Sequence, residues 1–189
     1  MICYGDALEI LTARDDRPDL IVTDPPYAFG GAGAEHALSA TVAVVLRESA
    51  ARLARGGWFV VFCASSWRSM AYMVEAVRGI VEPVRVGAWH KPAARTKART
   101  PGWAWASVSV LAMRKGKGNG EPAELLDWIL APPITNGRRA ELPAAVADWA
   151  VKPFARAGGV MLDPFAGSGA LVAAAERAGM YGVGYERDR

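Results

Sequence analysis

The most constraining feature of this chain is a strand, a glycine loop, a helix and a second strand in direct succession near its carboxyl end. Residues 160–162 form a short apolar run, residues 170–178 have helical composition, and residues 181–185 are again typical of a strand. Gly167 and Gly169 lie between the first strand and the helix, where glycine lets a ligand approach the backbone closely. The unit predicts an α/β fold with a ligand site at this loop.

The residues around the loop narrow the class of ligand. Glu186 comes about 20 residues after the loop, a spacing at which a carboxylate accepts hydrogen bonds from ribose hydroxyls. Loops that bind dinucleotides usually carry three glycines, and this loop lacks the third. The pattern therefore indicates a nucleotide-type ligand other than a dinucleotide.

The rest of the chain also alternates between strand-like and helix-like segments. Two strand-like runs have no clear helix between them, so we expect 84–89 and 107–113 to be antiparallel neighbours. The alternation predicts a doubly wound, Rossmann-like α/β sheet that is mostly parallel with one antiparallel strand. Strands are expected at 1–5, 20–23, 58–63, 84–89, 107–113, 160–162 and 181–185, and helices at 38–54, 66–78, 142–155 and 170–178.

A second motif, Asp24-Pro25-Pro26-Tyr27, directly follows the apolar run 20–23. Asp24 is therefore expected at the carboxyl end of a buried strand, the edge at which open α/β sheets bind ligands. The two prolines remove two N–H donors, which leaves the Asp24 carboxylate and the Pro25 carbonyl as acceptors for an NH₂ group. Tyr27 offers an aromatic face on which an extruded base can stack. The alternative is a simple turn, which the preceding strand and the distant glycine loop disfavour.

Charge is distributed unevenly along the chain. The net charge is +3, yet residues 83–120 contain eight Lys or Arg and no acidic residue. Such a stretch attracts phosphate groups, as in nucleic-acid binders, or is only a solvated basic loop. Beside a motif suited to a base amine we favour the first interpretation. The expected nucleic-acid-binding residues are Lys91, Arg95, Lys97, Arg99, Arg114, Lys115, Lys117, Arg138 and Arg139.

Other properties of the sequence argue against a membrane-spanning protein, a secreted protein and a metal-binding protein. No apolar run reaches the roughly 18 residues of a membrane span, and the first residues lack the features of a signal peptide. Cys3 and Cys63 are far apart, and the two histidines form no cluster with them, so no metal site is expected. A cytoplasmic protein that does not interact with membranes is predicted.

The two motifs together resemble those of the beta class of S-adenosylmethionine-dependent DNA amino-methyltransferases. In this chain the tetrapeptide comes first and the loop Asp163-Pro164-Phe165-Ala166-Gly167-Ser168-Gly169 comes last, which is the circularly permuted order of that class. The family methylates the exocyclic amine of adenine or cytosine. The resemblance implies S-adenosylmethionine as cofactor, double-stranded DNA as partner and flipping of the target base. It also allows a homodimer and a role in restriction-modification.

The resemblance assigns a role to each motif. The catalytic residues would be Asp24, Pro25, Pro26 and Tyr27, the first two on the amine and the tyrosine on the base. The cofactor-binding residues would be Asp6, Asp163, Phe165, Ala166, Gly167, Ser168, Gly169 and Glu186, with Asp6 on the adenine and Glu186 on the ribose. One departure is Leu142, where the family usually has Lys, so that a polar contact is missing or comes from Arg138 or Arg139.

The resemblance covers almost the whole chain and divides a single methyltransferase domain, 1–189, into parts. Residues 1–113 would form the catalytic half, 114–141 a loop available for target recognition, and 142–189 the cofactor-binding half. Short loops imply a short recognition site or little specificity.

The first residue of the tetrapeptide bears on which base would be methylated. Asp at the first position of the tetrapeptide favours N6 of adenine, whereas enzymes that methylate N4 of cytosine more often have Ser there, with exceptions. An RNA or protein methyltransferase is disfavoured, because in those families the glycine loop precedes the tetrapeptide. A relative that has lost activity and only binds nucleic acid is the alternative from a different class, and Leu142 permits it.

Overall fold

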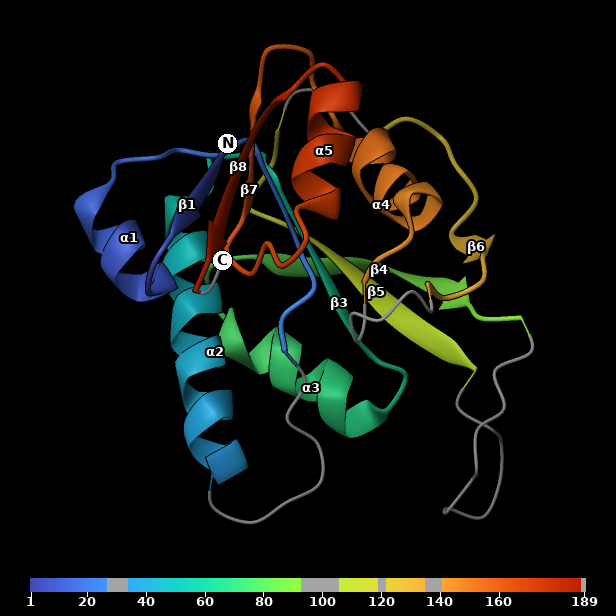
Figure 1. The fold of residues 1–189 in the computed structure, drawn as a ribbon, viewed down its shortest axis with the longest axis horizontal. Coiled ribbons are helices and arrows are strands. Elements are labelled where there is room, and N and C mark those ends of the chain that lie inside the picture. Colours follow the sequence, from blue (N-terminus) through green and yellow to red (C-terminus); the bar gives the residue numbers. More distant parts are fainter. Residues whose placement is uncertain (27–33, 93–105, 119–121, 135–140, 188–189) are drawn as a thin grey trace.

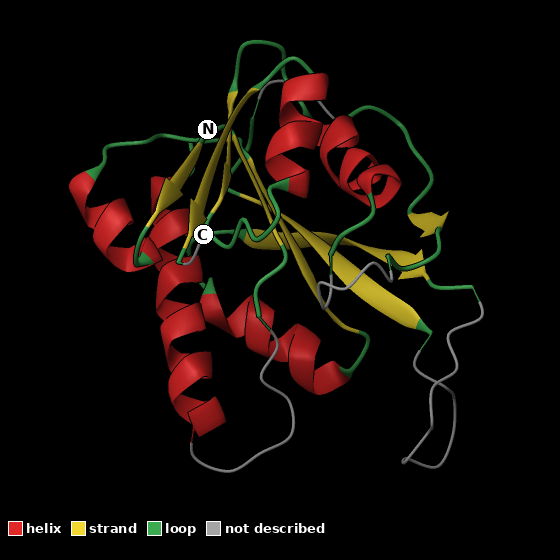
Figure 2. Cartoon of the chain, in the orientation of Figure 1, coloured by secondary structure: helices red, strands yellow, loops and turns green. Residues whose placement is uncertain are grey.

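The apolar runs of the chain form one eight-stranded sheet with helices on both faces, as the computed structural model shows (Figure 1, Figure 2). The structure describes residues 1–26, 34–92, 106–118, 122–134 and 141–187, and of residues 34–39 only the helical backbone. The strands are β1 (Ile2–Tyr4), β2 (Leu20–Thr23), β3 (Trp58–Ala64), β4 (Glu82–His90), β5 (Ser107–Arg114), β6 (Trp128–Leu130), β7 (Val160–Asp163) and β8 (Tyr181–Glu186). The helices are α1 (Ala7–Ala13), α2 (Ala34–Arg52), α3 (Trp67–Ala76), α4 (Ala144–Val151), the 3₁₀ helix η1 (Lys152–Phe154) and α5 (Ala170–Arg177).

The strand order is β1-β8-β7-β2-β3-β5-β4-β6. In this order β5 is antiparallel to both of its neighbours, β3 and β4, and all the other pairs are parallel. The predicted sheet, mostly parallel with one antiparallel strand, is therefore confirmed. From the central pair β7 and β2, the sheet extends in two directions. β3 lies beside β2 on one side, and β8 followed by β1 lies beside β7 on the other, which is the doubly wound arrangement.

Both faces of the central strands are buried, which explains why their sequences are continuous apolar runs. In β2, Leu20 and Val22 pack in the core under α4 and α5, while Ile21 packs in the core under α1, α2 and α3. Helix α2 buries one apolar face through Val42, Val45 and Leu46, and Leu53 directly after the helix is buried in the same core. Hydrophobic burial on two faces thus fixes the sheet between two helical layers.

Three elements differ from the sequence prediction. Helix α1 was not expected; its signal is Asp6, whose carboxylate accepts hydrogen bonds from the first-turn amides of Leu8 and Glu9. The strand β6 lies inside the segment 114–141 that was predicted to be a loop, and it pairs with β4. The helix predicted at 142–155 is split into α4 and η1, because Pro153 supplies no N–H for a continuing α-helix.

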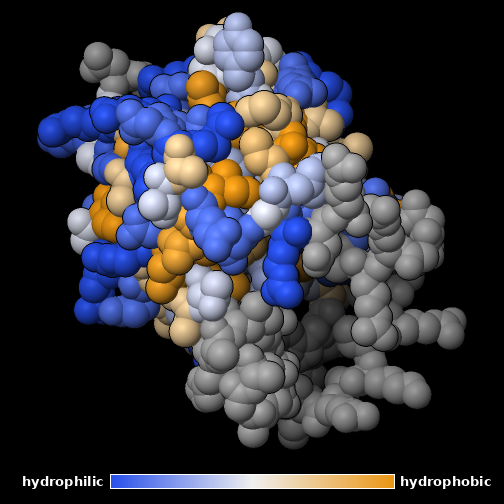
Figure 3. All heavy atoms as spheres, turned by 60° about the vertical axis from the view of Figure 1, so that its left-hand side comes forward, coloured by the Kyte–Doolittle hydropathy of each residue, from blue (hydrophilic) through white to orange (hydrophobic). Residues whose placement is uncertain are grey.

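The surface agrees with a chain whose apolar residues are mostly buried in its two cores. The side of the molecule that carries α1 and β1 shows hydrophilic residues over much of its area, with smaller hydrophobic areas between them (Figure 3). Among the described helices, none is both long enough and apolar enough to cross a membrane.

The packing of β8 against α5 gives the first prediction. A Cβ atom at Gly184 would lie 2.7 Å from the Cβ of Ala166 and 2.8 Å from Cγ2 of Val172. We expect Gly184→Ala to lower the free energy of unfolding by about 1–3 kcal/mol, because the crowded backbone must shift. Urea denaturation measures the effect. Tyr181→Ala, at a 68 % exposed position of the same strand, should change the free energy by less than about 0.5 kcal/mol, and equal effects would contradict the packing argument.

Candidate functional site

The carboxyl ends of the parallel strands gather the predicted site residues at one edge of the sheet. Asp24 follows β2, Asp163 ends β7, Glu186 ends β8, and Asp6 comes two residues after β1. The strands β7 and β2 are neighbours, and the chain winds outward from them in opposite directions. This is the switch point at which open α/β sheets bind their ligands. The two motifs, far apart in sequence, therefore meet at one place.

A buried hydrogen bond joins the two motifs. The hydroxyl of Thr23, at the end of β2, donates to Oδ1 of Asp163 at 2.7 Å, and the amide of Phe165 donates to the same oxygen at 3.1 Å. Thr23 and Asp163 are 0 % and 1 % exposed. The predicted direct contact of Asp163 with a cofactor has no support in this geometry, because the carboxylate is turned into the protein. It holds the glycine loop against the end of β2 instead.

Burial changes the ionisation of this acid. Removal from water raises the pKa of Asp163 from 3.8 to about 7; the hydrogen bonds from Thr23 and Phe165 oppose the shift, and the charges of Asp24 and Glu186 add to it. Between pH 3.8 and about 7, the Asp163 carboxyl group is protonated in the folded protein and ionised in the unfolded chain. Asp163 therefore makes folding less favourable as the pH rises through that range.

Asp163→Asn tests this directly. The amide oxygen can still accept from Thr23 and Phe165, but the side chain no longer titrates. We expect the wild-type protein to lose more free energy of unfolding than the variant between pH 4 and pH 7, by on the order of 1–3 kcal/mol. Denaturant unfolding at a series of pH values measures the difference. If the free energies of unfolding of the two proteins change with pH in the same way, Asp163 is ionised in the folded protein throughout this pH range.

The glycine loop is shaped by two residues in the left-handed region. Gly167 has φ +52° and Gly169 has φ +81°, and Gly169 is the N-cap of α5. The amide of Gly167 donates to Oε2 of Glu186 at 2.6 Å, which ties the loop to the end of β8. A Cβ atom at Gly167 would meet no atom within 4 Å, so open space lies over the loop. The loop can therefore admit a ligand close to its backbone.

The remaining predicted cofactor residues border this loop. Gly167 and Ser168 are exposed, Phe165 is half-buried, and Ala166 is buried with its amide bound to the carbonyl of Tyr185. Asp6 is exposed and caps α1, and the adjacent Gly5 donates its amide to the carbonyl of Glu186, so Asp6 lies next to the end of β8. The geometry thus brings Asp6, the loop and Glu186 together.

The tetrapeptide lies on the other side of the switch point. Asp24 is half-buried, Pro25 is buried and Pro26 is exposed; Tyr27 lies outside the described residues. Burial, helped by the negative charge of Asp24, raises the pKa of the Cys63 thiol to about 12, so this neighbour stays neutral near pH 7. Asp24, directly after β2, offers a carboxylate at this place that can accept a hydrogen bond from a ligand.

The structure divides the predicted nucleic-acid-binding residues into three sets. Lys91 follows β4 at the same edge as Asp24. Arg114, Lys115 and Lys117 come at the end of the antiparallel β5, where Arg114 pairs with Trp58, so they lie at the opposite edge of the sheet. The other five lie outside the described residues: Arg95, Lys97, Arg99, Arg138 and Arg139.

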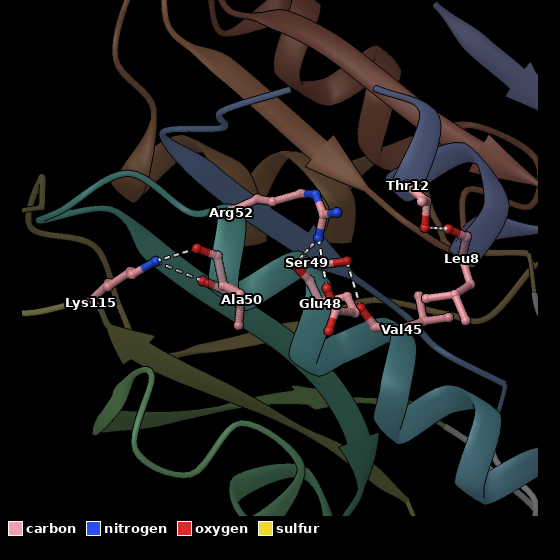
Figure 4. A network of polar contacts seen from close by, with 9 residues as sticks. Leu8, Thr12, Val45, Glu48, Ser49, Ala50, Arg52 and Lys115 are labelled. Carbon is pink, nitrogen blue, oxygen red and sulfur yellow. Dashed lines mark hydrogen bonds and ion pairs between the residues drawn. The ribbon is translucent and has the colours of Figure 1, made fainter. Parts of the chain in front are cut away.

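The residues at the opposite edge have contacts that stabilise the fold. Nζ of Lys115 donates to the carbonyls of Ala50 and Ala51, at 3.2 and 2.6 Å, in the last turn of α2 (Figure 4). The guanidinium of Arg114 lies 5.1 Å from the centre of the Trp58 ring. The sequence prediction assigned these cations to nucleic-acid binding because they belong to a basic stretch, and the direction of β5 was not known from the sequence. Because β5 runs away from the site, we leave them out of the ligand site.

Lys115→Met separates the two interpretations of this lysine. Loss of a cation at the end of α2 should lower the free energy of unfolding by about 1 kcal/mol. Affinity for DNA, and its dependence on salt, should stay as in the wild type, because the residue lies far from the site edge. Urea denaturation and a salt titration of DNA binding measure the two effects. A weaker salt dependence in the variant would return Lys115 to the nucleic-acid surface.

One contributor to the site was missed by sequence reasoning. Thr23 was treated only as the end of an apolar strand, yet its hydroxyl is the link to Asp163. A polar residue that closes a buried strand is the signal that could have pointed to it. Among the described residues, no group of three His, Cys, Asp or Glu side chains is placed to hold a metal ion.

Comparisons with known proteins bear on what this edge does. The profile of a family described as DNA methylase, N6_N4_Mtase, matches residues 82–189, which is more than half of the chain. No curated protein matches the chain.

Solved structures share the fold along the full length. M1.HpyAVI, in a complex with S-adenosylmethionine, has a TM-score of 0.79 and 21 % identity, covering 100 % of this chain and 92 % of that one. TTHA0409 from Thermus thermophilus, in a complex with S-adenosyl-L-methionine, has a TM-score of 0.75 and 24 % identity, covering 98 % and 86 %. The cytosine-N4-specific PvuII DNA methyltransferase has a TM-score of 0.76 and 18 % identity, covering 99 % and 81 %.

Proposed function

This chain belongs to the N6_N4_Mtase family of DNA methylases, and from that premise we propose that it transfers a methyl group from S-adenosylmethionine to the N6 amine of adenine in DNA. The observation that carries the proposal is the hydrogen bond between Thr23 and Asp163. It joins a strand that ends in an acceptor-rich tetrapeptide to a strand that ends in an open glycine loop. A methyl donor and a base amine bound at these two places would be neighbours.

The cofactor side of the site comprises Asp6, the loop from Phe165 to Gly169, and Glu186. We assign the exposed backbone of Gly167 and Ser168 to the methionine part and the Glu186 carboxylate to the ribose. Glu186 already accepts from the amides of Gly167 and Arg187, and a carboxylate offers about four acceptor positions. When bound, S-adenosylmethionine supplies an electrophilic methyl group on a sulfonium sulfur.

The tetrapeptide side activates the amine. The lone pair of an exocyclic amine is delocalised into the base, which makes the nitrogen a poor nucleophile. Asp24 and the Pro25 carbonyl accept hydrogen bonds from the two N–H groups, favour a pyramidal nitrogen and direct its lone pair toward the methyl carbon. A nitrogen that had taken the methyl group from the sulfonium, leaving a neutral thioether, would be more acidic, and Asp24 would accept the proton that it loses. Tyr27 stacks on the flipped base.

DNA is held at the part of this edge where β4 ends. Lys91 is the predicted cation that the structure places there. Five further cations outside the described residues stay sequence-based candidates for DNA binding: Arg95, Lys97, Arg99, Arg138 and Arg139. Cations at these positions attract phosphates without reading sequence, so the affinity should fall steeply as salt increases.

Asp24→Ala tests the proposed chemistry. We expect the variant to lose methyl transfer by at least about 100-fold, since the acceptor for the amine is gone, and to keep its affinity for S-adenosylmethionine. The measurement is tritiated methyl transfer to unmethylated duplex DNA, with calorimetry for cofactor binding. Asp15→Ala, at an exposed acid away from the edge, is the matched control and should keep wild-type activity. Full activity in Asp24→Ala would contradict the proposed mechanism.

Nucleoside mass analysis of the product decides between target bases. N6-methyladenine is expected from Asp at the first motif position. N4-methylcytosine would keep the mechanism and change the substrate, in line with the fold shared with the PvuII enzyme. If the wild-type protein binds S-adenosylmethionine but forms no product, the substrate is RNA, a partner is missing, or the chain is a binding protein that has lost activity; Leu142→Lys tests the last of these.

A further inference from the structure

We propose that Arg14, Asp16 and Tyr185 are positioning residues for the cofactor, because their hydrogen-bonded network fixes the end of β8 on which the proposed cofactor site is built. This role rests on the proposed function. It belongs to three residues that lie outside both motifs and that take no direct part in the proposed reaction. Their task is to hold the cofactor-binding groups in place before the cofactor arrives.

The backbone at the end of β8 joins the parts of the proposed cofactor site. The carbonyl of Tyr185 accepts from the amide of Ala166 in the glycine loop at 2.8 Å. The carbonyl of Glu186 accepts from the amide of Gly5, directly after β1, at 2.9 Å. The Glu186 carboxylate accepts from the amide of Gly167 at 2.6 Å. A displacement of Tyr185 would therefore move the loop, the proposed ribose acid and the segment that leads into α1.

The side chain of Tyr185 anchors this point in the protein. It is 0 % exposed, and its hydroxyl donates to Oδ2 of Asp16 at 2.7 Å. Nη2 of Arg14 donates to Oδ1 of the same carboxylate at 3.0 Å, and Nε of Arg14 donates to Oδ2. Such a two-point pairing holds a carboxylate in one orientation. Nη1 of Arg14 also donates to Sγ of Cys3, the residue opposite Tyr185 in the pairing of β1 with β8.

The protonation states of the network suit these hydrogen bonds. The hydrogen bond from Arg14 lowers the pKa of Asp16, and the one from Tyr185 adds to this effect, whereas partial burial opposes it. Burial raises the pKa of Tyr185, and the neighbouring Asp16 raises it further. Near neutral pH the carboxylate is therefore ionised and accepts, and the phenol is protonated and donates.

Helix α1 is held at both of its ends as a result. Asp6, its N-cap, lies next to the end of β8, and Arg14, its C-cap, is bound to Asp16. The network thus keeps Asp6 and Glu186, the acids proposed for the adenine and the ribose, at a fixed separation. A ligand that meets groups already in place loses less free energy in ordering them. Loss of the network should therefore weaken cofactor binding and leave the rate of the bound complex unchanged.

Two variants test the link from different sides. Tyr185→Phe removes the hydroxyl and keeps the ring that packs in the core, and Asp16→Ala removes the acceptor. For each we expect the Kd for S-adenosylmethionine, measured by calorimetry, to rise about 3- to 10-fold. The kcat at saturating cofactor and the KM for DNA should stay as in the wild type. The double variant should bind no more weakly than Asp16→Ala alone, because both changes remove the same link.

Asp148→Ala is the matched control. Asp148 on α4 accepts two hydrogen bonds from Arg177, at 3.0 and 2.6 Å, so the variant also removes an acid from an arginine pair, but away from β8. It should keep the wild-type Kd for S-adenosylmethionine. Urea denaturation of all variants measures their free energies of unfolding alongside.

The outcomes are distinguishable. A lower free energy of unfolding in Tyr185→Phe and Asp16→Ala, with an unchanged Kd, would overturn the inference and make the network a part of the fold alone. An equal rise of the Kd in Asp148→Ala, or additive losses in the double variant, would overturn it as well. Absence of S-adenosylmethionine binding by the wild-type protein would instead be a failure of the proposed function.

Discussion

The parallel pairing of β2 with β7 is the interaction on which the rest of the site depends. Leu20 lies opposite Met161 and Ile21 opposite Leu162, and both pairs are buried between the helical layers. The pairing is tied at its start, where the Asp19 carboxylate accepts from the amide of Val160, and at its end, where Thr23 donates to Asp163. Because a shift by one residue would turn every side chain of the strand to the other face, the register of this pair fixes where both motifs emerge.

The same edge of the sheet separates charge by strand. Acids lie at the ends of β1, β8, β7 and β2, and a cation follows β4, with β3 and β5 between them. A sulfonium cofactor is suited to the acidic side and a polyanion to the basic side, so each proposed ligand meets charge of the opposite sign. The antiparallel β5 contributes to this separation, because it carries the cations that follow it away to the far edge.

Much of this arrangement could be predicted from sequence, for reasons that lie in particular residues. The strands at 20–23 and 160–163 are mostly buried apolar runs that are followed by proline, and local signals of that kind are strong. Helix α1 and strand β6 are short, so their periodicity is too brief to detect, and only the cap at Asp6 marked the first of them. The placement of Arg114 and Lys115 depends on the direction of β5 relative to the site, which no local pattern encodes.

The tie between Gly167 and Glu186 has a consequence for turnover. In the proposed reaction a positively charged sulfonium would become a neutral thioether, and Asp6 and Glu186 would attract the first more strongly than the second. Contacts to the ribose and to the loop backbone would be the same for both and would not discriminate substrate from product. A change of charge rather than of shape would then favour the exchange of used for fresh cofactor.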